Sequence, residues 1–240
     1  MVERVGLFTG TASYYARFRS RYPPELLRLL VEHSRLDGTG RLLDLGSGPG
    51  FLAVPLAVYV AEVVAVDPEP EMLAEMGAPP NVRRVVGRAE DVDESWGAFR
   101  LATIGRAFHW MDGPLVLERL ARVTPQLALI GDRLEESDAQ VTLRDVAEEL
   151  FGERPAMKQP NVRYEESLAG SAFSDVLELQ VEVERVWTVD ELIGLAYSTS
   201  YGAPHRVGDR RDEFEAALRA RLRPTRERVT VYAVLGRQHE

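Results

Sequence analysis

The sequence predicts an α/β fold with a doubly wound, mostly parallel sheet, and three observations lead to this prediction. Apolar runs of strand length alternate with segments of helical spacing through residue 131. A glycine-rich turn, residues 46–50, directly follows the first apolar run. The length of 240 residues permits one sizeable α/β domain, and the hydrophobic content of 45% is ordinary for a globular chain. Such alternation favours parallel strands joined by right-handed crossovers, with helices on both faces of the sheet.

The elements follow from the spacing of apolar residues. The first predicted helix spans residues 24–36, where Leu26, Leu29 and Leu30 share one face. The predicted strands are residues 41–45, 63–67, 82–86, 99–105 and 126–131, with helices at residues 51–59, 69–76 and 114–123. We expect Asp112 to cap the last of these helices, because an aspartate at the N-cap accepts a hydrogen bond from a free backbone N–H.

The alternation ends after residue 131. Residues 152–171 predict a loop, because they contain Pro155, Pro160 and Gly170 and lack apolar residues in register. The other predicted elements are helices at residues 138–151, 189–197 and 210–222 and strands at residues 176–187 and 229–235. The chain has no internal repeat and no long linker, so residues 1–240 are predicted to form a single domain.

The turn after the first strand carries an unusual acid. Asp44, Gly46, Gly48 and Gly50 follow the spacing D-x-G-x-G-x-G, which differs from the G-x-G-x-x-G of dinucleotide-binding folds. Glycines allow a positive φ and a close approach of ligand to backbone, and the next helix begins with free N–H groups. A carboxylate two residues before the first glycine would repel a pyrophosphate. It suits a cationic ligand such as S-adenosylmethionine (SAM), which carries a sulfonium and an ammonium group.

A second acid, Asp67, ends the next predicted strand. It lies about 20 residues after the turn, where α/β nucleotide folds place the acid that accepts the ribose hydroxyls. The alternative is a helix N-cap, because residues 68–73 resemble a helix start. The two roles are compatible, and the pairing with the glycine turn favours the ribose role.

At these residues the chain resembles the class I SAM-dependent methyltransferases, in particular the small-molecule group called methyltransferase type 11. The matching segments are residues 42–50, 63–72, 87–91 and 107–110, with an N-terminal segment at residues 14–23. The resemblance is good for the first half of the chain and loose for the rest. It implies a Rossmann-like methyltransferase fold with a seven-stranded sheet, an antiparallel edge strand and a helical cap. It also implies a lid at residues 1–24 and substrate-cap insertions at residues 133–175 and 188–225.

The cofactor site is predicted from the turn, from Asp67 and from the resemblance. The residues expected to contact SAM are Tyr15, Arg19, Asp44, Gly46, Ser47, Gly48, Gly50, Asp67, Pro68, Met72, Ala89, Glu90, Gly105 and Arg106. The resemblance implies an adenine contact near Ala89. Arg88 stands where the family has an acid, so either Glu90 takes over that acid's contact or the contact is absent. The resemblance also implies that Arg19 pairs with the SAM carboxylate. An amphipathic helix packed on the core is the alternative for the N-terminal segment.

The candidate catalytic residue is His109, which follows the fourth strand. Ligands of such sheets lie beyond the carboxyl ends of the strands, and an imidazole accepts a proton near neutral pH. The alternatives are that His109 orients the acceptor, or that it only packs beside Phe108 and Trp110. His33, His205 and His239 lie in less suitable segments.

Aromatic residues are the candidates for an apolar pocket that holds the methyl acceptor. They are Tyr22, Trp110, Trp187, Tyr197 and Tyr201. Large aromatic side chains are also common in cores, so each of them has a structural alternative.

Composition excludes several function classes. The formal net charge of −9 opposes nonspecific binding to nucleic acid or to an anionic membrane. Lys158 is the only lysine and fits neither a P-loop nor the Tyr-x-x-x-Lys of short-chain dehydrogenases. There is no cysteine, so disulfides and thiolate metal sites are excluded. With no apolar run of transmembrane length and no secretory signal, we expect a cytoplasmic protein.

These observations predict a SAM-dependent methyltransferase that acts on a small molecule such as a secondary metabolite and releases S-adenosylhomocysteine (SAH). Oxygen is the first expected acceptor atom and nitrogen the second. Two alternatives stay open: an RNA or protein methyltransferase, and a noncatalytic SAM-binding partner protein. The sequence does not distinguish a monomer from a homodimer.

Overall fold

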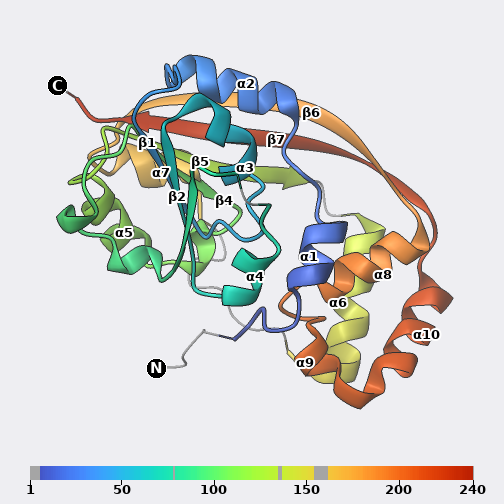
Figure 1. The fold of residues 1–240 in the computed structure, drawn as a ribbon. Helices are drawn as coiled ribbons and strands as arrows, with labels where there is room; N and C mark the ends of the chain where they lie inside the picture. Colours follow the sequence, from blue (N-terminus) through green and yellow to red (C-terminus); the bar gives the residue numbers. More distant parts are fainter. Residues whose placement is uncertain (1–5, 78, 135–136, 154–161, 240) are drawn as a thin grey trace. The chain divides into compact units, whose positions relative to one another are not determined.

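A computed structural model describes residues 6–77, 79–134, 137–153 and 162–239, and these divide into two compact units (Figure 1). The sheet unit comprises residues 22–133, 157–181 and 230–240, and the helical unit comprises residues 1–21, 134–156 and 182–229. Residues 154–161, which include Lys158 and two prolines of the predicted loop, lie outside the described residues.

Seven strands form one sheet in the order β3-β2-β1-β4-β5-β7-β6. The sheet is mostly parallel with an antiparallel edge pair, so the predicted fold class is confirmed. The strands are β1 (Arg41–Leu45), β2 (Glu62–Asp67), β3 (Val82–Val86), β4 (Leu101–Gly105), β5 (Gln126–Leu134), β6 (Asp175–Trp187) and β7 (Thr225–Arg237). Strands β6 and β7 each contribute residues to both units.

The register of the parallel strands brings their carboxyl ends to one edge. In β1, Asp44 lies opposite Ala65 of β2 and Thr103 of β4. The next residue, Leu45, is paired with Ile104, and Gly105 of β4 is paired with Ile130 of β5. The turns that follow β1, β2, β4 and β5 therefore emerge at a common edge.

Helices of the sheet unit alternate with the strands, as the sequence predicts. They are α2 (Pro24–His33), α3 (Ala53–Leu56), α4 (Pro70–Ala74), α5 (Gly113–Leu120) and α7 (Tyr164–Ala169), with 3₁₀ turns η1 (Ala57–Tyr59), η2 (Ala89–Asp91), η3 (Glu94–Trp96) and η4 (Phe108–Trp110). The core of this unit is made of buried aliphatic residues of β1, β2, β4 and β5 together with Phe99, Phe108 and Phe173.

The helical unit has a core of its own. Its elements are α1 (Ala12–Phe18), α6 (Asp138–Phe151), α8 (Val189–Tyr197), α9 (Pro204–Val207), η5 (Gly208–Arg210) and α10 (Arg211–Arg221). Leu143, Leu192, Phe214 and Leu218 are fully buried there. Helix α1 packs tightly on α8, because a Cβ atom at Gly194 would lie 2.5 Å from the Phe18 ring.

Several predicted elements differ from the structure in their bounds; for example, the fifth strand extends to Leu134 rather than to residue 131. Three other differences are as clear. The predicted loop at residues 152–171 contains α7, whose Tyr164 and Leu168 are buried. The last strand is longer than predicted, because its first residues, Thr225–Arg228, are mostly polar and hide the strand pattern. The helix predicted at residues 51–59 is divided into α3 and η1.

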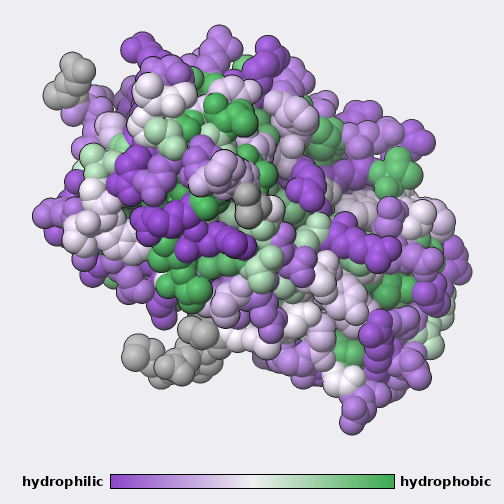
Figure 2. Space-filling model, viewed as in Figure 1, coloured by the Kyte–Doolittle hydropathy of each residue, from purple (hydrophilic) through white to green (hydrophobic). Residues whose placement is uncertain are grey.

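On the face shown in Figure 2, hydrophobic residues form small groups among hydrophilic ones. Large apolar side chains exposed among the described residues include Val58, Val86 and Val186, which come from η1, β3 and β6. Isolated exposed apolar side chains are ordinary on protein surfaces. Every helix among the described residues is too short or too polar to cross a bilayer.

Candidate active site

The glycine turn after β1 is closely packed against the segment that contains the candidate catalytic histidine. Gly46, Gly48 and Gly50 have φ of +62°, +53° and +83°, a region that favours glycine. A Cβ atom at Gly46 would lie 2.5 Å from Cβ of Ala107 and 3.2 Å from Cε of Met111. The absence of a side chain at position 46 therefore lets residues 107–111 approach the turn.

Asp44 is a buried carboxylate, and one of its two oxygens has no hydrogen-bond partner among the described residues. Its side chain is 1% exposed, and Oδ1 accepts a hydrogen bond from Thr103 Oγ1 at 2.7 Å. Oδ2 is buried and has no hydrogen bond of normal geometry within the described part of the chain. Burial raises the pKa of Asp44 to about 7, and the Thr103 hydroxyl and the Ala53 N–H only partly offset this effect.

Ser47 is the second buried polar group of the turn that lacks a partner. Its Oγ is buried and makes no hydrogen bond with any residue that the structure describes, while its backbone N–H donates to the Val66 carbonyl at 3.0 Å. A buried group without a partner is uncommon and calls for an explanation such as an absent ligand. These oxygens of Asp44 and Ser47 can each accept a hydrogen bond from a cationic donor, and the ammonium group of SAM is such a donor.

Asp67 at the end of β2 ties the two neighbouring turns together. Its Oδ2 accepts from the Gly48 N–H at 2.8 Å, and its Oδ1 accepts from the Glu69 N–H at 2.9 Å. Burial raises the pKa of Asp67 to about 6. Asp67 is not the N-cap of the next helix, because α4 begins at Pro70 and Glu69 occupies the N-cap position. Each carboxylate oxygen has a further acceptor site, so Asp67 can also receive ribose hydroxyls.

The remaining cofactor candidates of the sheet unit surround this edge. Pro68 follows Asp67, and Met72 of α4 is buried. Ala89 is buried in η2, and Glu90 accepts a hydrogen bond from the Asp112 N–H at 3.0 Å. Asp112 in turn caps α5 through the Leu115 N–H at 3.4 Å, which confirms the predicted cap. Adenine recognition by Ala89 and Glu90 stays a prediction.

The carboxyl end of β4 brings together residues that were predicted for different ligands. Gly105 accommodates the hydroxyl of Tyr22, since a Cβ atom at position 105 would lie 2.3 Å from that oxygen. The guanidinium of Arg106 lies 4.3 Å from the centre of the Tyr22 ring and 3.0 Å from Oδ1 of Asp132. Gly105 and Arg106 were predicted for the cofactor and Tyr22 for the acceptor, and the structure places all three in one cluster.

His109 lies in η4, within the segment that packs on the glycine turn. Its ring is half-buried and lies 5.0 Å from the ring of Trp110, centre to centre. Phe108 is fully buried and anchors the segment in the core, with its ring at 6.1 Å from that of Tyr164. His109 and Trp110 are thus held beside the turn, and their catalytic and acceptor roles stay predictions.

Five predicted residues lie in the helical unit, where each has partners of its own. Arg19 Nε donates to Ser198 Oγ at 2.9 Å, and the guanidinium lies 5.2 Å from the Tyr15 ring. Trp187 and Tyr197 are buried in the core of that unit, and Trp187 Nε1 donates to Glu227 at 2.9 Å. Tyr201 is partly buried. Their proposed contacts with cofactor or acceptor stay predictions.

Sequence reasoning missed two residues of this edge. Thr103 is a fully buried strand residue whose hydroxyl binds Asp44, and nothing in its apolar strand indicated that pairing. Asp132 follows the fifth predicted strand, and an acid placed just after a strand was a usable signal.

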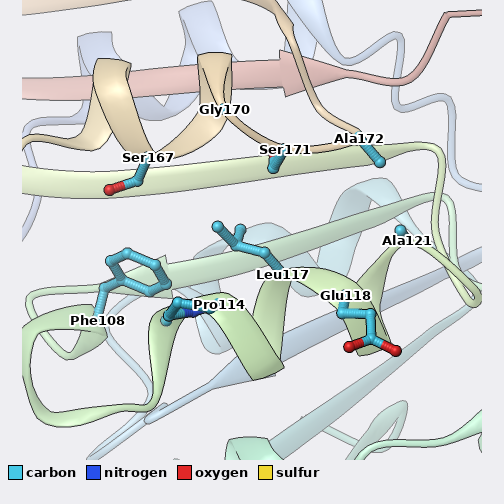
Figure 3. A pocket seen from close by; sticks show the side chains of 10 residues that line it. Phe108, Pro114, Leu117, Glu118, Ala121, Ser167, Gly170, Ser171 and Ala172 are labelled. Carbon is cyan, nitrogen blue, oxygen red and sulfur yellow. The ribbon is translucent and has the colours of Figure 1, made fainter.

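A cavity of about 450 Å³ lies elsewhere in the sheet unit, between α5 and the end of α7 (Figure 3). Its walls include Pro114, Leu117, Ser167 and Ala172, with Phe108 at one end. Among the predicted site residues, none contributes to its lining. This cavity is therefore distinct from the Asp44–Asp67 edge.

Comparison with known proteins decides the family. A profile for the methyltransferase domain matches residues 42–126, which contain the glycine turn and Asp67. An uncharacterized methyltransferase of Mycobacterium tuberculosis is 30% identical over 195 residues, which are 81% of this chain and 76% of that protein. The chain belongs to the class I SAM-dependent methyltransferases. SAM is therefore its cofactor and SAH its product.

Other relatives agree with this family. A protein of Dictyostelium discoideum that carries a methyltransferase name is 25% identical over 214 residues, 85% of this chain and 80% of that protein. The structure of a SAM-dependent methyltransferase from Geobacter sulfurreducens, solved with SAH, covers 100% of both chains with a TM-score of 0.56 and 17% identity. The YcgJ protein of a Bacillus species gives a TM-score of 0.55 at 16% identity and covers 90% of this chain and 99% of that chain. The two structures show that the fold is shared.

Proposed function

We propose that this methyltransferase methylates an oxygen, or in second place a nitrogen, of a small molecule held at the carboxyl ends of the strands. The observation that supports a small acceptor is charge. Asp44, Asp67 and Asp132 lie within the last three residues of β1, β2 and β5, and the chain carries a net charge of −9. An acidic edge of this kind opposes binding of an RNA backbone.

The residues of the turn hold SAM in this proposal. Asp44 Oδ2 and Ser47 Oγ receive the ammonium group, because both atoms are buried and have no hydrogen-bond partner among the described residues. Asp67 receives the ribose hydroxyls while it keeps its bonds to Gly48 and Glu69. When bound, SAM supplies the methyl group: an acceptor lone pair forms the new bond, the S–CH₃ bond breaks, and its electron pair stays on sulfur.

His109 is the proposed base. An oxygen or nitrogen acceptor loses a proton as it gains the methyl group, and a half-buried imidazole can take that proton. Its segment is fixed on one side by the buried Phe108 and on the other by the contact of Ala107 with Gly46. These contacts limit its motion, which favours productive orientation.

Transfer of a labelled methyl group tests this proposal. The enzyme is incubated with methyl-labelled SAM and, in parallel, a panel of small alcohols, phenols and amines, total RNA, and a mixed protein extract. We expect label in a small molecule and SAH in equal amount. Label confined to RNA or protein contradicts the small-molecule proposal. Binding of SAH without any methyl transfer supports the alternative of a noncatalytic partner protein.

A further inference from the structure

Arg106 has a strained backbone at the end of β4. Its φ is +55°, and Arg35 is the other non-glycine residue with a positive φ among the described residues. The Arg106 N–H donates to the Ile130 carbonyl at 2.8 Å, which fixes this conformation between β4 and β5. Glycine or asparagine would adopt it more readily, and strained residues of this kind gather at functional sites.

The side chain of Arg106 is held on two sides. Its guanidinium lies 4.3 Å from the centre of the Tyr22 ring, and its Nη2 atom lies 3.0 Å from Oδ1 of Asp132. The side chains of Arg106 and Asp132 are 12% and 22% exposed. This ion pair is more shielded from water than the exposed pairs on the surface of the chain, such as Arg122–Glu118 at 54% and 64%. Arg106 therefore fixes the direction of the Asp132 carboxylate.

Other charges near β5 are already neutralised by each other. Arg133 Nη1 and Nη2 both bind the Glu178 carboxylate, Arg133 also pairs with Glu165, and its guanidinium lies 3.9 Å from the Tyr232 ring. Arg133 thus does not add a positive charge to the edge.

The edge itself has an excess of acids. Asp44 and Asp67 lie in the last two residues of β1 and β2, Glu69 follows β2, Asp132 lies near the end of β5, and the basic Arg106 directly follows β4. Asp132 is an acid of this edge that is not assigned to SAM, and its carboxylate would repel an anionic acceptor. A neutral or cationic acceptor with an O–H or N–H group would not be repelled.

We propose that Asp132, positioned by Arg106, accepts a hydrogen bond from the O–H or N–H of the methyl acceptor, and that the acceptor is an alcohol, a phenol or an amine rather than a carboxylate. This inference rests on the proposed small-molecule function. Asp132 touches the acceptor, and Arg106 acts through Asp132 as a positioning residue. The reacting oxygen or nitrogen is thereby turned toward the methyl group, which increases the rate through orientation.

The test uses four phenyl compounds of similar size that differ in their polar group: 2-phenylethanol, 4-ethylphenol, 2-phenylethylamine and 3-phenylpropionate. Short aliphatic equivalents of the alcohol, the amine and the carboxylate are tested beside them. Methylated products are measured by mass spectrometry, and SAH affinity is measured by calorimetry. The variants are D132N, R106Q and R106K. R122Q, which breaks the exposed pair with Glu118, is the matched control.

We expect methyl transfer to the alcohols, phenols or amines and none to the carboxylates. D132N should lower kcat/KM about 10- to 100-fold, because a neutral amide replaces the charged carboxylate that accepts the hydrogen bond from the acceptor, while the Kd of SAH changes less than about twofold. R106Q should raise the acceptor KM more than it lowers kcat, and R106K should restore part of the loss because it keeps the charge beside Asp132. R122Q should behave as wild type.

Several results would overturn the inference. Preferred methylation of the carboxylates contradicts the acceptor class, and transfer to none of the panel counts against it too. Wild-type kinetics for D132N would contradict the proposed role of Asp132. The proposed function would still stand if a small molecule is methylated. Label found only in RNA or protein would instead contradict the proposed small-molecule function. If D132N unfolds, D132E replaces it: it keeps the carboxylate but displaces it, and unchanged kinetics in D132E at every pH would contradict a directed hydrogen bond.

Discussion

The affinity for SAM should depend on pH, because the proposed cofactor site contains two carboxyls whose pKa values are raised. Burial is the main cause for both, with a pKa of about 7 for Asp44 and about 6 for Asp67. In the proposed site the ammonium group binds the ionised form of Asp44. The protonated form must first release its proton, so affinity falls as pH decreases.

The size of the effect follows from the two pKa values. Between pH 7.5 and pH 6 the ionised fraction of Asp44 falls from about three quarters to about one tenth, which raises the Kd of SAM roughly eightfold. Asp67 adds about a further factor of two. The total is on the order of 15-fold, and the range stays below the titration of the ligand's own amino group, near pH 8.

Calorimetry at several pH values, in buffers of different ionisation enthalpy, measures both the Kd and the protons released. The control variant is D44N, which cannot titrate: it should bind SAM more weakly at pH 7.5 and lose most of the pH dependence. A wild-type Kd that changes less than twofold between pH 6 and pH 7.5 would refute this reasoning. So would proton uptake on binding.

The same carboxyls give opposite pH dependence to the stability of the free protein. Since their pKa values in the folded state lie above the unfolded value of 3.8, the folded state binds more protons between pH 4 and pH 7. Their contribution to the free energy of unfolding therefore falls as pH rises through this range. Urea unfolding of D44N beside wild type isolates the Asp44 contribution, which should be absent from the variant.

Three further variants test the site. Gly46→Ala should lower the free energy of unfolding by about 2–5 kcal/mol, because it adds backbone strain and a collision with Ala107. Gly38→Ala is the control: position 38 lies in open space at φ +88°, so this substitution should cost only the strain, about 1–2 kcal/mol. Urea denaturation measures both values. Asp67→Ala should weaken SAH binding by about 1.5–3 kcal/mol in calorimetry, and an unchanged Kd would remove the ribose contact. His109→Ala should lower kcat about 10²- to 10⁴-fold with SAH affinity nearly intact if the imidazole is the base, and wild-type turnover would exclude that role.

Much of the fold could be predicted from the sequence, because the local pattern of apolar and turn residues agrees with the secondary structure that the chain adopts. The apolar runs of β1, β2 and β4 are buried on both faces, so they appear as continuous apolar segments bounded by turns. Helix α8 spans Val189–Tyr197 as predicted, since Thr188 and Glu191 form a capping box that marks its start. Helix α7 was missed because it is only six residues long and depends on burial of Tyr164 and Leu168 for its stability.

The site was predictable only where chemistry and spacing coincide. Asp44, the glycines and Asp67 carry a pattern with a physical meaning, and the structure places them together. Arg106 and Asp132 form an ion pair although they are 26 positions apart in the sequence, so neither local segment predicts this pairing. The buried Thr103 likewise acquires its role only when β4 pairs with β1.

A crystal structure of the SAH complex tests the central claim most directly. We predict SAH at the turn of Gly46–Gly50, with its ammonium group within about 3.2 Å of Asp44 Oδ2 or Ser47 Oγ and a ribose hydroxyl within the same distance of Asp67. Its sulfur should face the segment of residues 107–111. SAH bound elsewhere, or bound at the turn with its ribose away from Asp67 and with Asp44 Oδ2 still unfilled, would contradict the account.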